Sequence, residues 1–187
     1  MSAVQTSYAT RIDMMKLYER LERYTSLQSR VLSQSNAEQA EYILITPGDY
    51  KIVNPLIELA LADVADYLGA LITFEHSGLD ALTEWGLKDN LLRRIETAAG
   101  DTEEKPEYYL KAVYKLPGTS HHDYVTGLHE MVFEAIAMHV IGSWFKHLGY
   151  GNKAQLYVQE YYMRLNKARN AAPAWKNAPK RRPSVNL

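Results

Sequence analysis

The chain has 187 residues, of which 47% are hydrophobic and 23% are charged, and its formal net charge is −1. This length suits one domain, or one domain with a trailing arm, and the composition is typical of a globular protein. Cysteine is absent, which excludes disulfides, thiolate zinc sites, iron–sulfur clusters and cysteine nucleophiles. No apolar run reaches the roughly 18 residues that a membrane helix needs, and the first ten residues lack the order of a signal peptide, so we expect no membrane association.

The small net charge hides a division along the chain. Residues 1–163 carry 14 basic and 22 acidic side chains, a net −8, whereas residues 164–187 carry seven basic and no acidic side chains, a net +7. Opposite charges of this kind indicate an arm that binds an acidic neighbour, either nucleic acid or another subunit.

The first part of the chain predicts a helix and then a short strand. Apolar residues at helical spacing indicate an amphipathic helix that begins near Thr10 and ends within 33–36. The apolar run 42–45, which stops at Thr46-Pro47-Gly48-Asp49, is interpreted as a short strand, although the end of a helical turn also fits this pattern.

A second helix is expected to begin at Asn54 and Pro55, because Asn can cap a helix and Pro costs no hydrogen bond at the first helical position. This helix should end near 75–78. Residues 79–99 are expected to form one broken helix or two short ones, and residues 101–107 an acidic surface loop.

At Tyr108 the apolar period changes from about 3.6 residues to 2, and the alternation continues to Leu116. This pattern predicts a half-buried strand, which Pro117-Gly118 ends. One strand cannot stand alone, so the expected partner is the strand at 42–45.

The last part of the chain predicts a helical hairpin followed by an arm. Residues 123–170 contain two apolar-periodic segments separated by Gly149-Tyr150-Gly151, and the first is apolar on several sides, which predicts a central position. The last 15 residues contain three prolines, which prevent further helix. We therefore predict a mostly α-helical bundle with a long C-terminal hairpin and a small β element over residues 1–170, and an extended basic arm over 171–187.

Five histidines between positions 121 and 147 are the first candidates for metal binding. On one helix His122, His129 and His147 share a face, but they lie roughly 10 and 27 Å apart along it, so one metal ion cannot bind two of them. The zinc-protease pattern of two histidines four residues apart and the di-iron pattern of Glu three residues before His are both missing. We therefore expect polar packing or interface roles, no metal and no cofactor. The alternative is a helical metal-dependent enzyme built on His122, His129 or His139.

The sequence contains no nucleophile elbow, phosphate loop or dinucleotide-binding glycine motif, so no residue can be named as catalytic. The 14 tyrosines against three phenylalanines suit an interface that stays partly wet, since tyrosine combines an apolar ring with a hydroxyl group. Tyr157, Tyr161 and Tyr162 are candidates for a subunit interface, and a semi-buried core position is the other interpretation of each. The arm combines an aromatic anchor with a basic, proline-containing segment, and its candidate partner-binding residues are Trp175, Lys180, Arg181, Arg182, Pro183 and Val185.

Several of these features resemble the helical head–tail connector proteins, or portal adaptors, of tailed bacteriophages. The resemblance covers about two thirds of the chain, and residues 1–45 and 79–107 have no counterpart in it. The features that carry it are the strand 108–116 ending in Leu-Pro, the long apolar helix ending in Gly-Ser-Trp144-Phe145-Lys-His-Leu-Gly, the segment Asn152-Lys-Ala154-Gln-Leu-Tyr157, and Tyr162-Met-Arg-Leu165-Asn-Lys-Ala168-Arg169 before a basic end.

The resemblance implies a non-enzymatic virion protein that assembles in the host cytoplasm and forms a ring of about twelve subunits at the head–tail interface. Its partners would be the portal protein and the tail or further neck proteins, and double-stranded DNA would pass through the ring without sequence-specific contact. The arm would bind the portal or a neighbouring subunit. Two alternatives stay open, a nucleic-acid-binding module that uses the basic tail and the metal-dependent enzyme.

Overall fold

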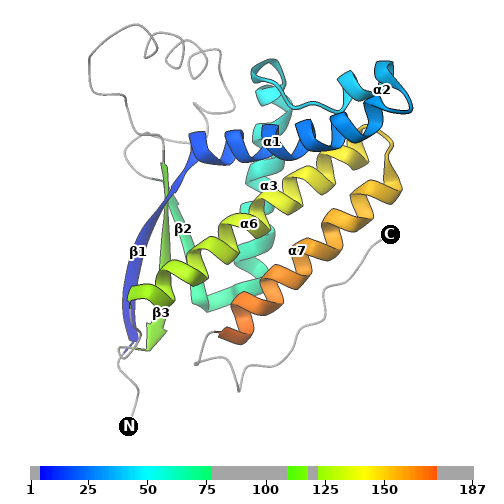
Figure 1. Ribbon diagram of the computed structural model, residues 1–187. Helices are drawn as coiled ribbons and strands as arrows, with labels where there is room; N and C mark the ends of the chain where they lie inside the picture. Colours follow the sequence, from blue (N-terminus) through cyan, green and yellow to red (C-terminus); the bar gives the residue numbers. More distant parts are fainter. Residues whose placement is uncertain (1–4, 77–108, 118–121, 172–187) are drawn as a thin grey trace, which may run out of the picture.

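The computed structural model describes residues 5–76, 109–117 and 122–171, and it places a small sheet at one end of a set of packed helices (Figure 1). The elements in chain order are β1 (Gln5–Asp13), α1 (Met14–Ser33), α2 (Ala37–Tyr42), the 3-10 helix η1 (Pro47–Asp49), α3 (Tyr50–Leu68), the 3-10 helix η2 (Gly69–Leu71), β2 (Ile72–His76), β3 (Tyr109–Pro117), α6 (His122–His147) and α7 (Gly151–Ala171). The predicted class, mostly α-helical with a small β element, is confirmed.

The sheet has the strand order β1-β3-β2, and both pairs are antiparallel. β3 confirms the strand predicted in this region, because the alternate residues from Leu110 to Leu116 are buried. Its partners differ from the prediction, since Tyr8 of β1 and Ile72 of β2 both lie opposite Tyr114. The central strand therefore pairs on both sides, which stabilises a sheet of three strands better than an isolated hairpin.

The helix expected to begin near Thr10 begins at Met14, because residues 5–13 form β1. Tyr8, Thr10 and Ile12 alternate along β1, and such aromatic and β-branched residues favour a strand. The Asp13 carboxylate then accepts a hydrogen bond from the Lys16 backbone N–H at 3.2 Å and caps α1. The prediction was wrong at this boundary because the alternating pattern of β1 runs directly into the apolar stripe of α1, with no break between the two elements.

The strand predicted at 42–45 was also wrong. The alternative, the end of a helical turn, is confirmed, since Tyr42 ends α2 and Ile43 is its C-cap. Ile43 and Ile45 are buried, and side chains satisfy their backbone polar groups in place of a β ladder. The Trp144 indole N–H donates to the Ile43 carbonyl at 3.0 Å, and the Thr25 hydroxyl accepts from the Ile45 N–H at 3.1 Å. This segment therefore joins α1 to α6.

α3 begins at Tyr50 and not at Asn54, and it ends at Leu68 and not near 75–78. The Asp49 carboxylate accepts a hydrogen bond from the Thr46 N–H at 2.9 Å, which closes the turn before the helix. Asn54 is buried and accepts a hydrogen bond from the Tyr18 hydroxyl, so it packs in the core and does not cap the helix.

The C-terminal helical hairpin is confirmed as α6 and α7, and Gly149 has a φ of +82° in the connection. α6 is central, as predicted, because it contacts α1, α3, α7 and β1 (Figure 1). Close approach of α7 requires a small residue at Gly142, where an added Cβ would lie 3.4 Å from both the Ala154 carbonyl oxygen and the Tyr157 Cβ.

Two predictions fall on residues outside the described ranges, the helices within 79–99 and the acidic loop over 101–107. The predicted arm over 171–187 also lies outside them except for Ala171, which is the last residue of α7. Among the helices that the structure describes, none combines the length and the apolar character needed to span a membrane.

Candidate functional site

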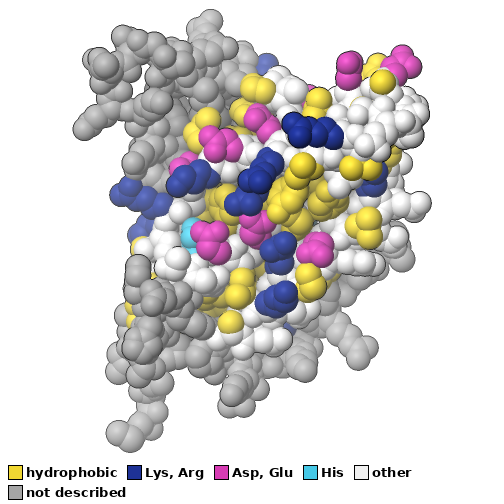
Figure 2. Space-filling model, viewed as in Figure 1, with side chains coloured by type: hydrophobic (Ala, Val, Ile, Leu, Met, Phe, Trp, Pro, Cys, Tyr) yellow, Lys and Arg dark blue, Asp and Glu magenta, His cyan; other side chains and the backbone are white. Residues whose placement is uncertain are grey.

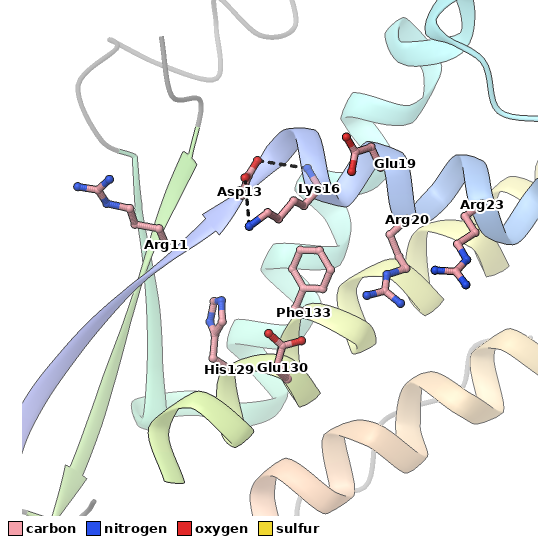
Figure 3. Close-up of a pocket in the computed structure, with 9 residues that line it drawn as sticks. All are labelled: Arg11, Asp13, Lys16, Glu19, Arg20, Arg23, His129, Glu130 and Phe133. Atoms are coloured by element: carbon pink, nitrogen blue, oxygen red, sulfur yellow. Dashed lines mark hydrogen bonds and ion pairs between the residues drawn. The ribbon is translucent and has the colours of Figure 1, made fainter. Parts of the chain in front are cut away.

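A hollow of about 550 Å³ opens where β1, the beginning of α1 and the first half of α6 meet (Figure 3). Arg20 and Arg23 point from α1 toward α6, and Phe133 points up between the two helices. The hollow is strongly charged but mixed in sign, since its lining contains Arg11, Lys16, Arg20 and Arg23 together with Asp13, Glu19 and Glu130.

His129 forms the polar end of this hollow and is held from two strands. Its Nδ1 lies 2.8 Å from the Thr10 hydroxyl of β1 and 3.2 Å from the Tyr114 hydroxyl of β3. Burial lowers the pKa of His129, against the opposing effects of Glu130 and of a hydrogen bond to the Arg11 backbone. The imidazole is therefore neutral near pH 7 and ties α6 to the sheet.

The cations at the hollow are partly neutralised by neighbouring carboxylates. Lys16 lies 3.8 Å from Asp13, and Arg20 forms a 3.1 Å ion pair with Glu134. The Glu134 side chain is only 13% exposed, and it also accepts a hydrogen bond from the Tyr24 hydroxyl at 3.0 Å. The two contacts of Glu134 join α1 to α6, so Arg20 has a structural role before any ligand is considered.

Figure 2 shows the face of the molecule on which α1 and α7 flank α6. An apolar strip lies between the two outer helices, and Lys and Arg side chains lie on both sides of it. Tyr157 packs in this region, where its ring stacks on Phe145 with the ring centroids 5.5 Å apart. Burial raises the pKa of Tyr157, and a hydrogen bond to Gln28 of α1 acts in the opposite direction.

A second polar cluster lies where α3 meets the second half of α7. The Asp63 carboxylate accepts a hydrogen bond from His139 Nε2 at 2.8 Å, and the His139 ring contacts the Tyr161 ring edge to face at 5.0 Å. Tyr67 donates a hydrogen bond to Asn166 at 2.6 Å. The Arg169 guanidinium lies 5.7 Å from the centre of the Tyr67 ring, which is a cation–π contact.

With Asp66, which lies near Tyr161 as Asp63 does, this second cluster has two carboxylates and one cation, Arg169. Burial lowers the pKa of His139 despite the hydrogen bond and the charge of Asp63, which act to raise it. His139 is therefore neutral near pH 7 and does not cancel the charge of Asp63, whose side chain is 49% exposed. Burial raises the pKa of both Tyr161 and Tyr162, and Asp63 adds to each effect, so both hydroxyls stay protonated.

The structure separates the three candidate interface tyrosines. Tyr161 is only 3% exposed and belongs to the core of its own chain, so the interface interpretation does not apply to it directly. Tyr157 and Tyr162 are half-buried, and only Tyr162 lies beside the acidic cluster, with its ring 6.1 Å from that of Tyr67. The candidate arm residues, Trp175 among them, lie outside the described residues.

Sequence reasoning missed Asp63, Asp66 and Tyr67 as members of a site. The signal was present, because Asp63 and Asp66 lie off the apolar stripe of their helix and three residues apart. Their proximity to Tyr162 and Arg169 could not be read from the sequence, since about 100 residues separate the two segments.

The histidines considered as metal ligands are dispersed. His129 contacts the sheet and His139 contacts α3, whereas His147 is exposed beside Trp144. Within the described ranges, no three His, Asp or Glu side chains lie close enough to hold a metal ion. No family model, curated protein or solved structure was found to match the chain.

Proposed function

We propose that the protein is a structural virion component that assembles with its own copies into a ring at the phage head–tail connector. There it would join the portal to the tail and extend the channel through which DNA passes. The observation that carries the proposal is the division of charge between a net −8 over residues 1–163 and a net +7 over residues 164–187. A chain that carries two complementary charges on different parts can bind the next copy in a repeating, head-to-tail contact.

The charges of the described helices support this reading. α3 carries Glu58, Asp63 and Asp66 but only one basic residue, Lys51, in its first turn. Asp63 lies one helical turn before Tyr67, which contacts both Asn166 and Arg169, so this carboxylate is on the side of α3 that faces the end of α7.

Exposed apolar side chains give a second line of support. Leu27 and Val31 of α1, Ile52 and Leu59 of α3, and Leu156, Val158 and Met163 of α7 are all exposed. Apolar residues on several helices suit a subunit that is covered by neighbours on more than one side. A closed ring needs two different contact surfaces on each subunit, whereas a simple dimer needs one.

The acidic body also suits a channel for DNA. A lining of unpaired Lys and Arg would bind phosphates and retard a passing duplex. In the described part of the chain, Arg20, Arg164 and Lys16 each lie within 4.0 Å of a carboxylate, which reduces their availability to phosphate.

The test is co-expression with the portal protein of the same phage, followed by mass photometry and electron microscopy. Wild-type protein should add a ring to the portal. Replacing Lys180, Arg181 and Arg182 by Ser should reduce ring formation, because it removes three charges from the arm. The matched control replaces three exposed basic residues of the body, Arg30, Lys115 and Lys146, by Ser and should assemble as wild type does.

Two outcomes would favour the alternatives. A wild-type protein that stays monomeric with the portal, and that binds DNA with an affinity that falls steeply with salt and is lost in the arm variant, would indicate a nucleic-acid-binding module. A stoichiometric metal ion in the purified protein would indicate the metal-dependent enzyme.

A further inference from the structure

We infer that the outward side of α3, together with Tyr162 of α7, is the surface that binds the basic C-terminal segment, residues 172–187, of an adjacent copy. We call this surface the α3 outer face and define it by Leu59, Ala62, Asp63, Asp66 and Tyr162. The inference rests on the proposed function and adds to it the receiving side of the contact between subunits.

The α3 outer face is continuous on the helix surface. Ala62 and Asp63 lie three and four residues after Leu59, and Asp66 lies four and three residues after them, which places all four on one side of an α-helix. All four are exposed, and Leu59 is 50% exposed although it is a large apolar residue. The face therefore offers apolar and acidic groups side by side.

The composition of residues 172–187 is complementary to this face. The segment contains four basic residues and no acidic residue, together with Trp175 and Val185. Its charges can pair with Asp63 and Asp66, and its Trp can cover Leu59 and the Tyr162 ring. An acidic cluster alone would attract any cation, but the adjoining apolar residues favour a basic peptide that carries apolar side chains.

The charges of the face are available for such a partner. Asp63 contacts His139, which is neutral near pH 7, and within the described residues no Lys or Arg lies within ion-pair distance of Asp66. The residues that face Asp63 from α6 and α7 are His139, Tyr161 and Tyr162. None of these carries a positive charge at neutral pH.

The face already binds one arginine of its own chain at its edge. The guanidinium of Arg169 lies over the Tyr67 ring, one turn of α3 from Asp63. Arginine on a tyrosine ring beside a carboxylate is a favourable arrangement for this side chain. The same chemistry is offered next to it by Tyr162 and Asp63 for an arginine from another chain.

The segment is long enough to reach a neighbouring copy. α7 ends at Ala171, and the prolines at 173, 179 and 183 predict an extended chain. At about 3.1 Å per residue, the remaining 16 residues span roughly 50 Å, whereas the 19 residues of α3 span roughly 29 Å. A segment of this length can therefore reach the α3 outer face of an adjacent copy as well as that of its own chain, and the measurements below separate the two.

The first measurement uses the full-length protein assembled with the portal. Unlabelled and ¹⁵N-labelled chains are mixed as dissociated subunits at high salt and returned to low salt, and carboxylates are then coupled to lysines by a zero-length reagent. We expect coupled peptides that join Asp63 or Asp66 to Lys176 or Lys180 and that combine one labelled and one unlabelled chain. If labelled and unlabelled subunits share rings but coupling occurs only within single chains, the inference is overturned. Coupling of Lys176 and Lys180 to other carboxylates would also overturn it.

The second measurement compares matched variants. Replacing Asp63 and Asp66 by Asn removes two charges but keeps the acceptor for His139, and it should weaken subunit association by up to about fivefold for each charge. Replacing Glu38 and Glu41, two exposed acidic residues of α2, by Gln removes the same charge and should leave association unchanged. If the Asn variant associates as wild type does, the α3 outer face is not the docking surface, but the ring remains.

A third variant separates the proposed docking surface from the proposed function. The Ser variant of Lys180, Arg181 and Arg182 replaces residues outside the described helices, and its circular dichroism spectrum should match that of wild type. If this variant fails to assemble but the Asn variant assembles normally, the segment binds another surface. If wild-type protein forms no ring with the portal, the proposed function itself is wrong.

Discussion

Thr25 joins α1 to the segment after α2, and its replacement by Val tests how much this join stabilises the fold. The Thr25 hydroxyl accepts a hydrogen bond from the Ile45 N–H at 3.1 Å and donates to the Leu21 carbonyl at 3.1 Å. Thr25 and Ile45 are both buried, so water cannot replace the lost oxygen. Val has a similar shape and helix propensity, and the substitution therefore removes little except the hydroxyl.

The magnitude follows from the group that loses its partner. A buried N–H without an acceptor costs about 1–3 kcal/mol, and burial of the additional methyl group returns up to about 0.8 kcal/mol. We therefore expect Thr25→Val to lower the free energy of unfolding by about 1–2 kcal/mol. For a chain of this size, such a loss lowers Tm by about 2–8 °C.

The assay is urea unfolding followed by circular dichroism, combined with hydrogen exchange at the Ile45 amide. Thr25→Ser is the control, because it keeps the oxygen and removes a methyl group, so the Ile45 amide should stay protected whatever the change in global stability. The reasoning is refuted if Thr25→Val is as stable as wild type and its Ile45 amide exchanges no faster.

The remaining predictions concern packing and pH. Gly142→Leu should lower the free energy of unfolding by about 1–3 kcal/mol, because α7 atoms already lie 3.4 Å from the position of an added Cβ. Gly127→Ala should raise it by up to about 1 kcal/mol, because no atom lies within 4 Å of its added Cβ. Urea unfolding measures both, and equal effects would contradict the packing argument. Burial lowers the pKa of His129 and His139 below the ordinary 6.5, so below that pH the unfolded chain binds more protons than the native one. The free energy of unfolding should therefore decrease as the pH falls below about 6.5, by at most about 1.4 kcal/mol per pH unit for each histidine. A free energy of unfolding that stays constant between about pH 7 and 5 would contradict this sign.

Local periodicity determined the elements whose pattern lies within one segment. The alternation along β3 and the two apolar-periodic segments of the α6–α7 hairpin are visible in the sequence because each buries a face set by its own repeat. The break at Gly149 is equally local, since its positive φ favours glycine in any context.

Partner choice was decided only by the tertiary structure. Residues 42–45 have the apolar run of a strand, yet Trp144 and Thr25 satisfy their backbone groups, and β1 and β2 pair with β3 instead. The beginning of α3 shows the same limit, because Asn54 has the chemistry of a cap but binds the Tyr18 hydroxyl in the core. A short polar or apolar motif does not specify which distant group will cover it.

For the candidate site, too, some features were determined by the sequence and others only by the tertiary structure. Sequence alone determined that the chain carries opposite charges and that its basic end is rich in proline, because composition does not depend on folding. Only the tertiary structure places Asp63 and Tyr67 beside Tyr162. It also buries Tyr161, which composition does not distinguish from Tyr162. The reason is physical: helical phase decides which side chains face out, but the packing of α3 against α6 and α7 decides which outward side chains become neighbours.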